Sequence, residues 1–228
     1  MCKLSVIIPA YNEEKYIEPT LEALNNQSIS RSNYEIIVCN DNSTDNTCKI
    51  SKSYADKVID LKKCDSIAQV KNEGVKHAIG EKLLFIDADT VAHHNLIERI
   101  IESDSHYGRP KVVIGDGTSF SWPNSLNKTL NFINPKFTIA GGCCMFFNKK
   151  LFNEINGFNE NLECLEDFDI ELKVMKKKYK TEIIDSFVKT NDRRFRQLTF
   201  LKNVWDLVYY WFTYVTGKKQ IRQYVKIR

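Results

Sequence analysis

Three short apolar runs constrain the fold of this 228-residue chain more than any other feature of its sequence. They are VII at 6–8, IIV at 36–38 and LLFI at 83–86, and none of them alternates between apolar and polar residues. Strands of this kind are buried on both faces, as in a parallel sheet that helices cover on both sides. Amphipathic, helix-like segments separate the runs. The sequence therefore predicts an α/β fold with a mostly parallel sheet flanked by helices.

The same patterns predict the individual elements. We expect strands at 4–9, 34–39, 57–60, 82–86, 111–114 and 142–147, and helices at 14–24, 66–79 and 166–178. Asp65 is expected to cap the helix at 66–79, and Gly80 to end it. Residues 115–140 are rich in Gly, Pro, Asn and Ser, which is typical of a connecting region. The length suits one domain, which we assign to 1–190, with a C-terminal helical extension at 191–228.

The charge of the chain is divided unevenly. Residues 1–172 contain 18 Lys/Arg and 25 Asp/Glu, whereas residues 173–228 contain 15 Lys/Arg and only 4 Asp/Glu. A basic C-terminal region favours an anionic partner. The segment LTFLKNVWDLVYYWFTYV at 198–215 also carries many aromatic rings, which favour the headgroup level of a membrane. We therefore expect 198–228 to lie on a membrane surface or a lipid-linked acceptor; the alternative is a helix that packs on the domain or on a second copy in a homodimer.

The sequence also indicates where the protein resides. No stretch reaches the roughly 18 uninterrupted apolar residues of a membrane-spanning helix, and no secretory signal is apparent. Cys39, Cys143 and Cys144 lie inside apolar runs, as buried reduced thiols do in cytosolic proteins. We expect a cytoplasmic protein that is peripheral at the inner face of a membrane.

Acidic and amide side chains follow three of the predicted strands. Glu13 comes after the first strand, Asp41 after the second, and the triplet Asp87-Ala88-Asp89 after the fourth. Ligands of such sheets bind at the carboxyl ends of the strands. The side chains of residues i and i+2 in an extended segment point the same way, so Asp87 and Asp89 can both contact one ligand. Their hard oxygen atoms suit Mg²⁺ or Mn²⁺. The alternative is that both cap the helix that begins near Asn95.

A second acidic pair, Glu166-Asp167, opens the predicted helix at 166–178. Helix capping alone could explain a carboxylate at this place. In sugar transfer a carboxylate at this place could act as a general base, because an acceptor hydroxyl is a poor nucleophile until a carboxylate takes its proton. A metal stabilises the departing diphosphate in such a reaction. Asp167 is our candidate base. Asp41 could accept a hydrogen bond from a nucleotide base or ribose, and Asp45 is interpreted as a turn and capping residue.

Taken in order, these motifs resemble the family-2 glycosyltransferases, which adopt the GT-A fold. The resemblance runs from residue 4 to about residue 179 and is carried by VIIPAYNEE (6–14), NDNSTDNT (40–47), KNEGVKHAIGEKLLFIDAD (71–89), GGCCMFFNKKLFNEINGFNE (141–160) and LEDFDIELKVMKKKYK (165–180). It implies inverting transfer of a single sugar from a nucleotide diphosphate sugar to an acceptor hydroxyl on a glycan or a lipid-linked molecule. UDP-sugars are expected before GDP-mannose.

The resemblance also implies roles for individual residues. Asp87 would reach the ribose, Asp89 would hold the Mg²⁺ or Mn²⁺ ion of a DxD motif, and Asp167 would be the general base. The remaining donor-binding residues would be Pro9, Ala10, Tyr11, Glu13, Asp41 and Lys71. Lys71 stands where Arg is frequent, which keeps the charge but loses bidentate geometry.

The chain departs from the family pattern at two further places. It has Asn40-Asp41-Asn42 where Asp-Asp-Gly or Asp-Asp-Asn is usual, with Asp41 in the second position. The Gln-x-x-Arg-Trp signature of processive synthases is absent, which favours one sugar per encounter. Arg193, Arg194 and Arg196 occupy that neighbourhood and could contact the donor diphosphate or an acceptor phosphate. The alternative is a solvated basic loop.

Other classes of protein remain as alternatives. A nucleotidyltransferase acting on sugar phosphates would share the sheet and the acidic site, but it usually has a Gly-rich basic loop where this chain has YNEE. A non-catalytic sugar-nucleotide-binding protein would share the sheet and the nucleotide-binding residues but would not transfer the sugar. A dinucleotide oxidoreductase would need GxGxxG after the first strand, which is missing. No nucleic-acid-binding motif accompanies the basic C-terminal region, so we expect no nucleic acid partner.

Overall fold

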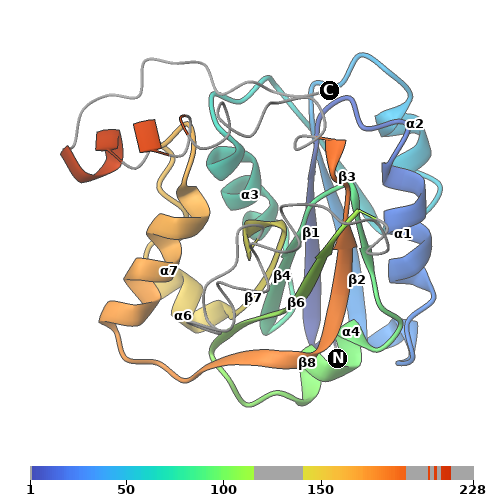
Figure 1. Cartoon of the computed structure of the whole chain (residues 1–228). Coiled ribbons are helices and arrows are strands. Elements are labelled where there is room, and N and C mark those ends of the chain that lie inside the picture. Colours follow the sequence, from blue (N-terminus) through green and yellow to red (C-terminus); the bar gives the residue numbers. More distant parts are fainter. Residues whose placement is uncertain (1, 116–140, 194–204, 206–207, 210–211, 217–228) are drawn as a thin grey trace.

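The computed structural model describes residues 2–115, 141–193, 205, 208–209 and 212–216 (Figure 1). Within these residues eight strands form one sheet in the order β3-β2-β1-β4-β7-β6-β8-β5. The strands are β1 (Leu4–Ala10), β2 (Tyr34–Asp41), β3 (Lys57–Leu61), β4 (Lys82–Ile86), β5 (Thr90–Ala92), β6 (Tyr107–Ile114), β7 (Cys144–Asn148) and β8 (Thr181–Thr190). The neighbours β3, β2, β1 and β4 are parallel, whereas β7 runs antiparallel to both β4 and β6. The fold is therefore α/β with a mixed sheet whose N-terminal half is parallel, as the sequence predicts.

Helices cover both faces of the sheet, as Figure 1 shows. One face packs against α1 (Ile17–Asn25), α2 (Thr47–Ser51) and α4 (Leu96–Glu102), and the other against α3 (Ile67–Lys76), α6 (Lys149–Glu154) and α7 (Glu166–Lys176). Because side chains alternate along a strand, β1 contributes Ile8 to the first core and Ile7 to the second. Cys39, Cys143 and Cys144 are buried, as expected. No helix among the described residues is long and apolar enough to cross a membrane.

The structure extends and corrects the predicted elements. Every expected strand is present, but β6 begins four residues before the expected 111–114. Pro110 lies at an irregularity in the pairing of β6 with β8, and a proline inside a strand weakens the sequence pattern that would predict it. β5 and β8 were not predicted. Ser66, not Asp65, caps α3, since its extended backbone lets its side chain accept a hydrogen bond from the Gln69 amide.

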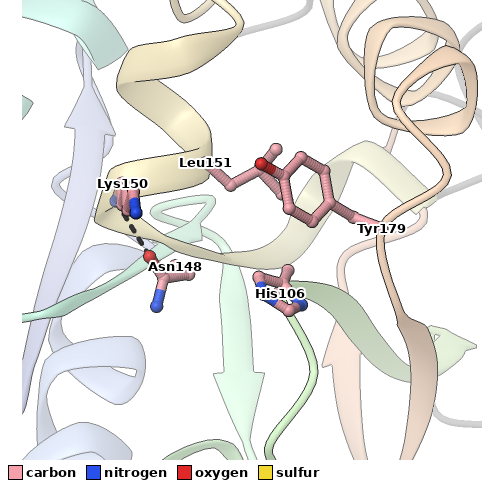
Figure 2. A pocket seen from close by; sticks show the side chains of 5 residues that line it. All are labelled: His106, Asn148, Lys150, Leu151 and Tyr179. Carbon is pink, nitrogen blue, oxygen red and sulfur yellow. Dashed lines mark hydrogen bonds between the residues drawn. The ribbon is translucent and has the colours of Figure 1, made fainter.

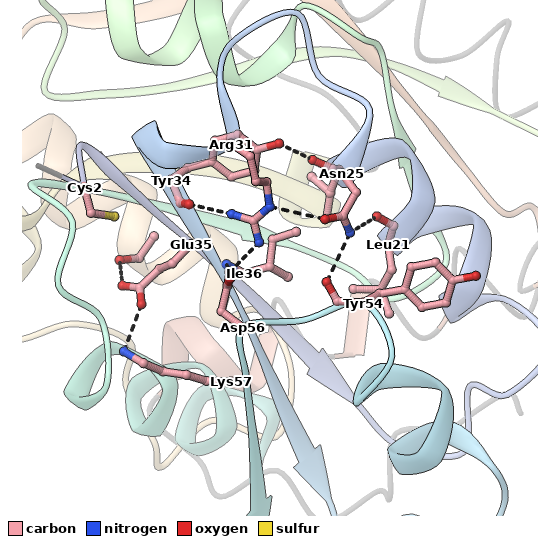
Figure 3. A network of polar contacts seen from close by, with 12 residues as sticks. Cys2, Leu21, Asn25, Arg31, Tyr34, Glu35, Ile36, Tyr54, Asp56 and Lys57 are labelled. Carbon is pink, nitrogen blue, oxygen red and sulfur yellow. Dashed lines mark hydrogen bonds and ion pairs between the residues drawn. The ribbon is translucent and has the colours of Figure 1, made fainter.

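A polar network ties the amino ends of the parallel strands together (Figure 3). Arg31, in the short helix η1 (Arg31–Asn33), donates to the Tyr34 carbonyl at 2.5 Å and pairs with Asp56. The Asp56 carboxylate in turn accepts from the Ile36 amide at 2.6 Å, and Lys57 pairs with Glu35 at 2.9 Å. These contacts fix the start of β2 against β3, so their role is structural.

Candidate functional site

The carboxyl ends of β1, β2 and β4 meet at one edge of the sheet, because the three strands are parallel neighbours. Pro9 and Ala10 are the last two residues of β1 and are buried in the sheet directly before this edge. Tyr11 follows them and opens the loop to α1, half-buried. Asp41 is the last residue of β2, and Asp87 comes directly after β4. The expected convergence of acidic residues at one edge is therefore present.

The loop after β1 is held to the loop after β2. The Asn12 amide donates to Ser43 Oγ at 3.0 Å, the Thr44 amide donates to Asn12 Oδ1 at 2.8 Å, and the Glu13 amide donates to Thr47 Oγ1 at 2.7 Å. Asn12 has a left-handed backbone with φ 54°, a conformation that asparagine tolerates better than most residues. These contacts fix the backbone position of Glu13.

Two aspartates near β2 have structural partners. Asp41 is buried, and its Oδ1 accepts from the Cys64 amide at 2.6 Å, which ties the end of β2 to the segment before α3. Asp45 accepts from the Thr47 amide at 2.9 Å and from the Glu14 amide at 3.1 Å. Burial opposes the effect, but these hydrogen bonds hold the pKa of Asp45 below its usual value. Asp45 thus has the turn geometry expected for it, whereas the N-cap position of α2 is occupied by Asn46.

Lys71 is the cation at the centre of the site. It lies in α3, only 2% exposed, and its Nζ is 2.9 Å from Glu166 Oε1 and 5.1 Å from the centre of the Phe158 ring. Burial alone would lower its pKa, but Glu166, Asp87 and Asp167 together raise it above the ordinary value. Lys71 is therefore charged and compensates several carboxylates at once.

Asp167 packs against the short helix that directly precedes β7, the strand that pairs with β4. A Cβ added to Gly142 would lie 2.2 Å from Asp167 Oδ2, so the carboxylate packs directly on this glycine. The next residue, Cys143, accepts a hydrogen bond through its carbonyl from the Asp87 amide at 2.9 Å. The short helix η2 (Gly141–Cys143) therefore brings Asp167 and Asp87 to the same place.

The carboxylates at this edge are difficult to ionise together. Burial, and secondarily the charges of Asp89, Glu166 and Asp167, raises the pKa of Asp87 to about 8, although Lys71 opposes this. Burial and then Glu166 raise the pKa of Asp167 to about 6. Burial also raises the pKa of Asp89. The edge therefore holds more carboxyl groups than its own cations can keep ionised together, which is the situation that a bound cation relieves.

Arg193 bridges the two acidic loops. Its guanidinium donates to both carboxylate oxygens of Glu13, at 2.9 and 2.5 Å, lies 3.1 Å from Asp89 Oδ2 and stacks 4.8 Å from the centre of the Tyr16 ring. Burial raises the pKa of Glu13 above its usual value despite this pairing. Strand β8 puts Arg193 there, because Thr190 pairs with Thr90 and the Asn191 amide donates to the Asp89 carbonyl.

The structure thus places most of the predicted site residues together. It does not support the alternative that Asp87 and Asp89 cap a helix, because β5 follows them and the next helix begins at Leu96. Arg194 and Arg196 lie outside the described residues. The pairing of Glu166 with Lys71, the packing of Asp167 on Gly142 and the contact of Arg193 with Asp89 were not predicted. The Gly141-Gly142 pair was a usable signal, since glycines often mark a close approach of the backbone.

The Lys71→Met variant should lose about 3–5 kcal/mol of unfolding free energy at pH 7, because it leaves the buried carboxylates without their cation. The loss should shrink at pH 5, because this pH lies below the pKa of about 6 of Asp167, whereas Asp87, with a pKa of about 8, is already mostly protonated at pH 7. Urea denaturation at both pH values measures this. The control is Lys111→Met, which removes an exposed pair with Asp185 and should cost less than about 1 kcal/mol. Equal losses in the two variants would contradict the assignment.

Replacing Gly142 with alanine should lower turnover about a hundredfold with little change in donor affinity, because the new methyl group displaces the Asp167 carboxylate. Gly142 does not have the left-handed backbone that would make alanine strained, so the fold should survive. Turnover and donor affinity are measured side by side. A variant that turns over like the wild type would show that the position of Asp167 is unimportant.

One small cavity lies far from this edge (Figure 2). It has a volume of about 120 Å³ and is lined by His106, Asn148, Lys150, Leu151 and Tyr179. Asn148 pairs with Lys82 at the start of β4, whereas Asp87 follows the end of β4. This cavity therefore lies toward the opposite end of the sheet and is not part of the candidate site.

Comparison with known proteins gives a consistent match. Residues 5–156 match the sequence model of glycosyl transferase family 2. A poly(ribitol-phosphate) beta-glucosyltransferase of Bacillus spizizenii is 28% identical over 164 residues, which are 67% of this chain and 26% of that protein. The poly(ribitol-phosphate) beta-N-acetylglucosaminyltransferase TarS of Staphylococcus aureus is 38% identical over 95 residues, 39% of this chain and 16% of TarS. The chain thus spans about a quarter or less of the length of these relatives.

Solved structures share the fold. The crystal structure of S. aureus TarS 1–349 in complex with UDP-GlcNAc superimposes with a TM-score of 0.65 at 24% identity, covering 84% of this chain and 59% of that one. The mannosyltransferase PcManGT of Pyrobaculum calidifontis, in complex with GDP-Man and Mn²⁺, gives a TM-score of 0.64 at 18% identity, covering 81% and 56%. The described residues therefore have the GT-A fold of these structures.

Proposed function

Because the chain belongs to glycosyl transferase family 2, we propose that it transfers a single sugar from a nucleotide diphosphate sugar to an acceptor hydroxyl. One observation carries the proposal. Two ion clusters, Lys71 with Glu166 and Arg193 with Glu13 and Asp89, hold buried carboxylates at the carboxyl edge of the parallel strands. This is the edge at which open α/β sheets bind their ligands.

Asp167 is the base in this proposal. Its carboxylate takes the proton of the acceptor hydroxyl as the acceptor oxygen forms a bond to the anomeric carbon. The bond from that carbon to the diphosphate oxygen breaks, and the diphosphate leaves with the electron pair. A single displacement from the face opposite the leaving group inverts the anomeric configuration. The raised pKa of about 6 keeps Asp167 mostly ionised at neutral pH yet more basic than an ordinary aspartate.

A divalent cation fits the donor set of the edge. Asp89 would hold Mg²⁺ or Mn²⁺, with Asp87 beside it and nearer the ribose. The cation would be held by one or two carboxylates together with substrate phosphates, the usual arrangement for Mg²⁺. When bound, the cation supplies positive charge to the departing diphosphate.

Arg193 competes with such a cation in the donor-free protein, since it lies 3.1 Å from Asp89. Its guanidinium suits a diphosphate as well as a carboxylate, so we assign it to the donor side of the site. Asp41, whose Oδ1 already binds the Cys64 amide, is assigned to the nucleoside end. We propose a UDP-sugar as donor, which agrees with the UDP-GlcNAc bound to TarS; the GDP-Man bound to PcManGT makes GDP-mannose the second choice. The acceptor is proposed to be a glycan or a lipid-linked molecule.

A thermal-shift panel tests the proposal. Ligands that bind only the folded state stabilise it by about 2.7 kcal/mol at a hundred times their dissociation constant. We expect one of UDP-GlcNAc, UDP-glucose or GDP-mannose to raise the midpoint temperature with Mn²⁺ or Mg²⁺, and to raise it less with chelator. Nucleoside triphosphates with sugar phosphates serve as the comparison, since they would be favoured by a nucleotidyltransferase. A panel in which no nucleotide sugar shifts the midpoint would contradict the proposal.

A further inference from the structure

Four large apolar side chains near the C-terminus are exposed to solvent. Trp205 is 62% exposed, Val208 53%, Phe212 50% and Val215 60%. Phe212 and Val215 lie about one turn apart in the described helical stretch 212–216, so their side chains share a face. In the sequence Trp205 and Val208 precede them at helical intervals of three and four residues. We call these four exposed side chains the apolar stripe.

The other side of the same segment is anchored to the domain. The Tyr214 hydroxyl donates to Asp169 Oδ1 at 3.0 Å, and its ring meets the Phe168 ring edge-on at 5.7 Å between centres. Thr213 is buried, with 4% exposure. In Figure 1 the described helical pieces of this segment lie beside α7. The apolar stripe is therefore held facing outward, next to the turn of α7 that carries Asp167.

We propose that the apolar stripe docks this protein on an anionic lipid bilayer surface. Trp and Phe favour the level of the headgroups, and an amphipathic helix with cationic neighbours binds in the plane of the interface. Residues 198–228 contain six Lys/Arg and one Asp, so the sequence around the stripe is strongly basic. Each cation near an anionic surface adds to the attraction. A second copy of the chain fits less well, because two basic segments would meet in such a contact.

The proposal extends the proposed function. If sugar transfer takes place next to Asp167, a lipid surface at the stripe would bring a lipid-linked acceptor hydroxyl to the base. The docking itself can be tested without any transfer.

Co-sedimentation of the full chain with vesicles tests the docking. The vesicles are phosphatidylcholine alone or phosphatidylcholine with about one third phosphatidylglycerol. We expect the protein to sediment with the anionic vesicles, and the double variant Phe212→Ser with Val215→Ser to bind about tenfold more weakly or worse. Both side chains are exposed, so the fold should not change. The matched control is Ile79→Ser, which removes an apolar side chain that is 67% exposed elsewhere and should sediment like the wild type.

Two outcomes would overturn the proposal. One is equal sedimentation of the double variant and the wild type with anionic vesicles. The other is a wild-type chain that does not sediment with vesicles but forms a dimer in analytical ultracentrifugation, while the double variant is a monomer. Donor-induced thermal shifts are measured on the same variants. Unchanged donor shifts in a variant that no longer binds vesicles separate the docking from the proposed function.

Discussion

Replacing Asp167 with asparagine should slow sugar transfer by about 10²–10⁴ while the donor still binds, because removal of a general base costs this much in rate. Asparagine is nearly the same size, and Gly142 leaves room for no larger group, so the packing should persist. Single-turnover rates and donor-induced thermal shifts measure the two effects separately. Asp185→Asn is the matched control: this carboxylate is exposed and pairs only at the surface with Lys111, so its variant should transfer normally.

The pH profile gives an independent check of the same base. Burial and Glu166 raise the pKa of Asp167 to about 6, and its ionised form is the active one. Transfer should therefore increase as the pH rises through about 6 and level off above it. The residual rate of Asp167→Asn should lack this rise. A normal rate in the variant, or a product that retains the donor's configuration, would show that Asp167 is not the base of an inverting reaction.

Replacing Asp89 with asparagine should reduce transfer about a hundredfold or more if the proposed metal is held there, since such a metal would contribute several kcal/mol of charge stabilisation at the diphosphate. Asp89 is half-buried with a raised pKa, so losing its charge should leave the fold intact. Arg193 retains its two contacts with Glu13. Transfer rates across a range of Mn²⁺ concentrations measure the effect.

The control for Asp89 is Asp104→Asn, a carboxylate at the surface that pairs with Lys180. It should show the wild-type dependence on Mn²⁺. Full transfer by the wild type in excess chelator would show that the reaction needs no metal. In that case the contact of Arg193 with Asp89 would leave the guanidinium as the cation nearest the diphosphate.

The sequence was sufficient to predict the parallel half of the sheet, where the donor site is proposed. The runs at 6–8, 36–38 and 83–86 are buried on both faces. Because their residues do not alternate between apolar and polar, the sequence directly indicates parallel strands. Their parallel order then placed Glu13, Asp41 and Asp87 at one edge. Only the positions of side chains that pack across the sheet remained to be found.

The other half of the sheet was predicted less well, for physical reasons. β8 is buried on one face, and its signal is the alternation of Ile184, Ser186, Val188 and Thr190 with more exposed residues. The inward positions at 186 and 190 are polar, which weakens this signal. Without β8 there is no reason to bring Arg193 to Asp89, 104 positions earlier in the chain. Likewise, the pairing of Lys71 with Glu166 depends on how α3 and α7 pack, which local patterns do not report.

Proton NMR of the donor's anomeric signal shows directly whether this edge turns over a nucleotide sugar. The donor is the one that the thermal-shift panel selects, incubated with Mn²⁺ and with water as the surrogate acceptor. We expect slow, metal-dependent loss of the donor signal, a first product of inverted configuration, and loss that is at least about a hundredfold slower with Asp167→Asn. A donor that binds but is never consumed by the wild type would contradict the proposed transfer and indicate a non-catalytic sugar-nucleotide-binding protein.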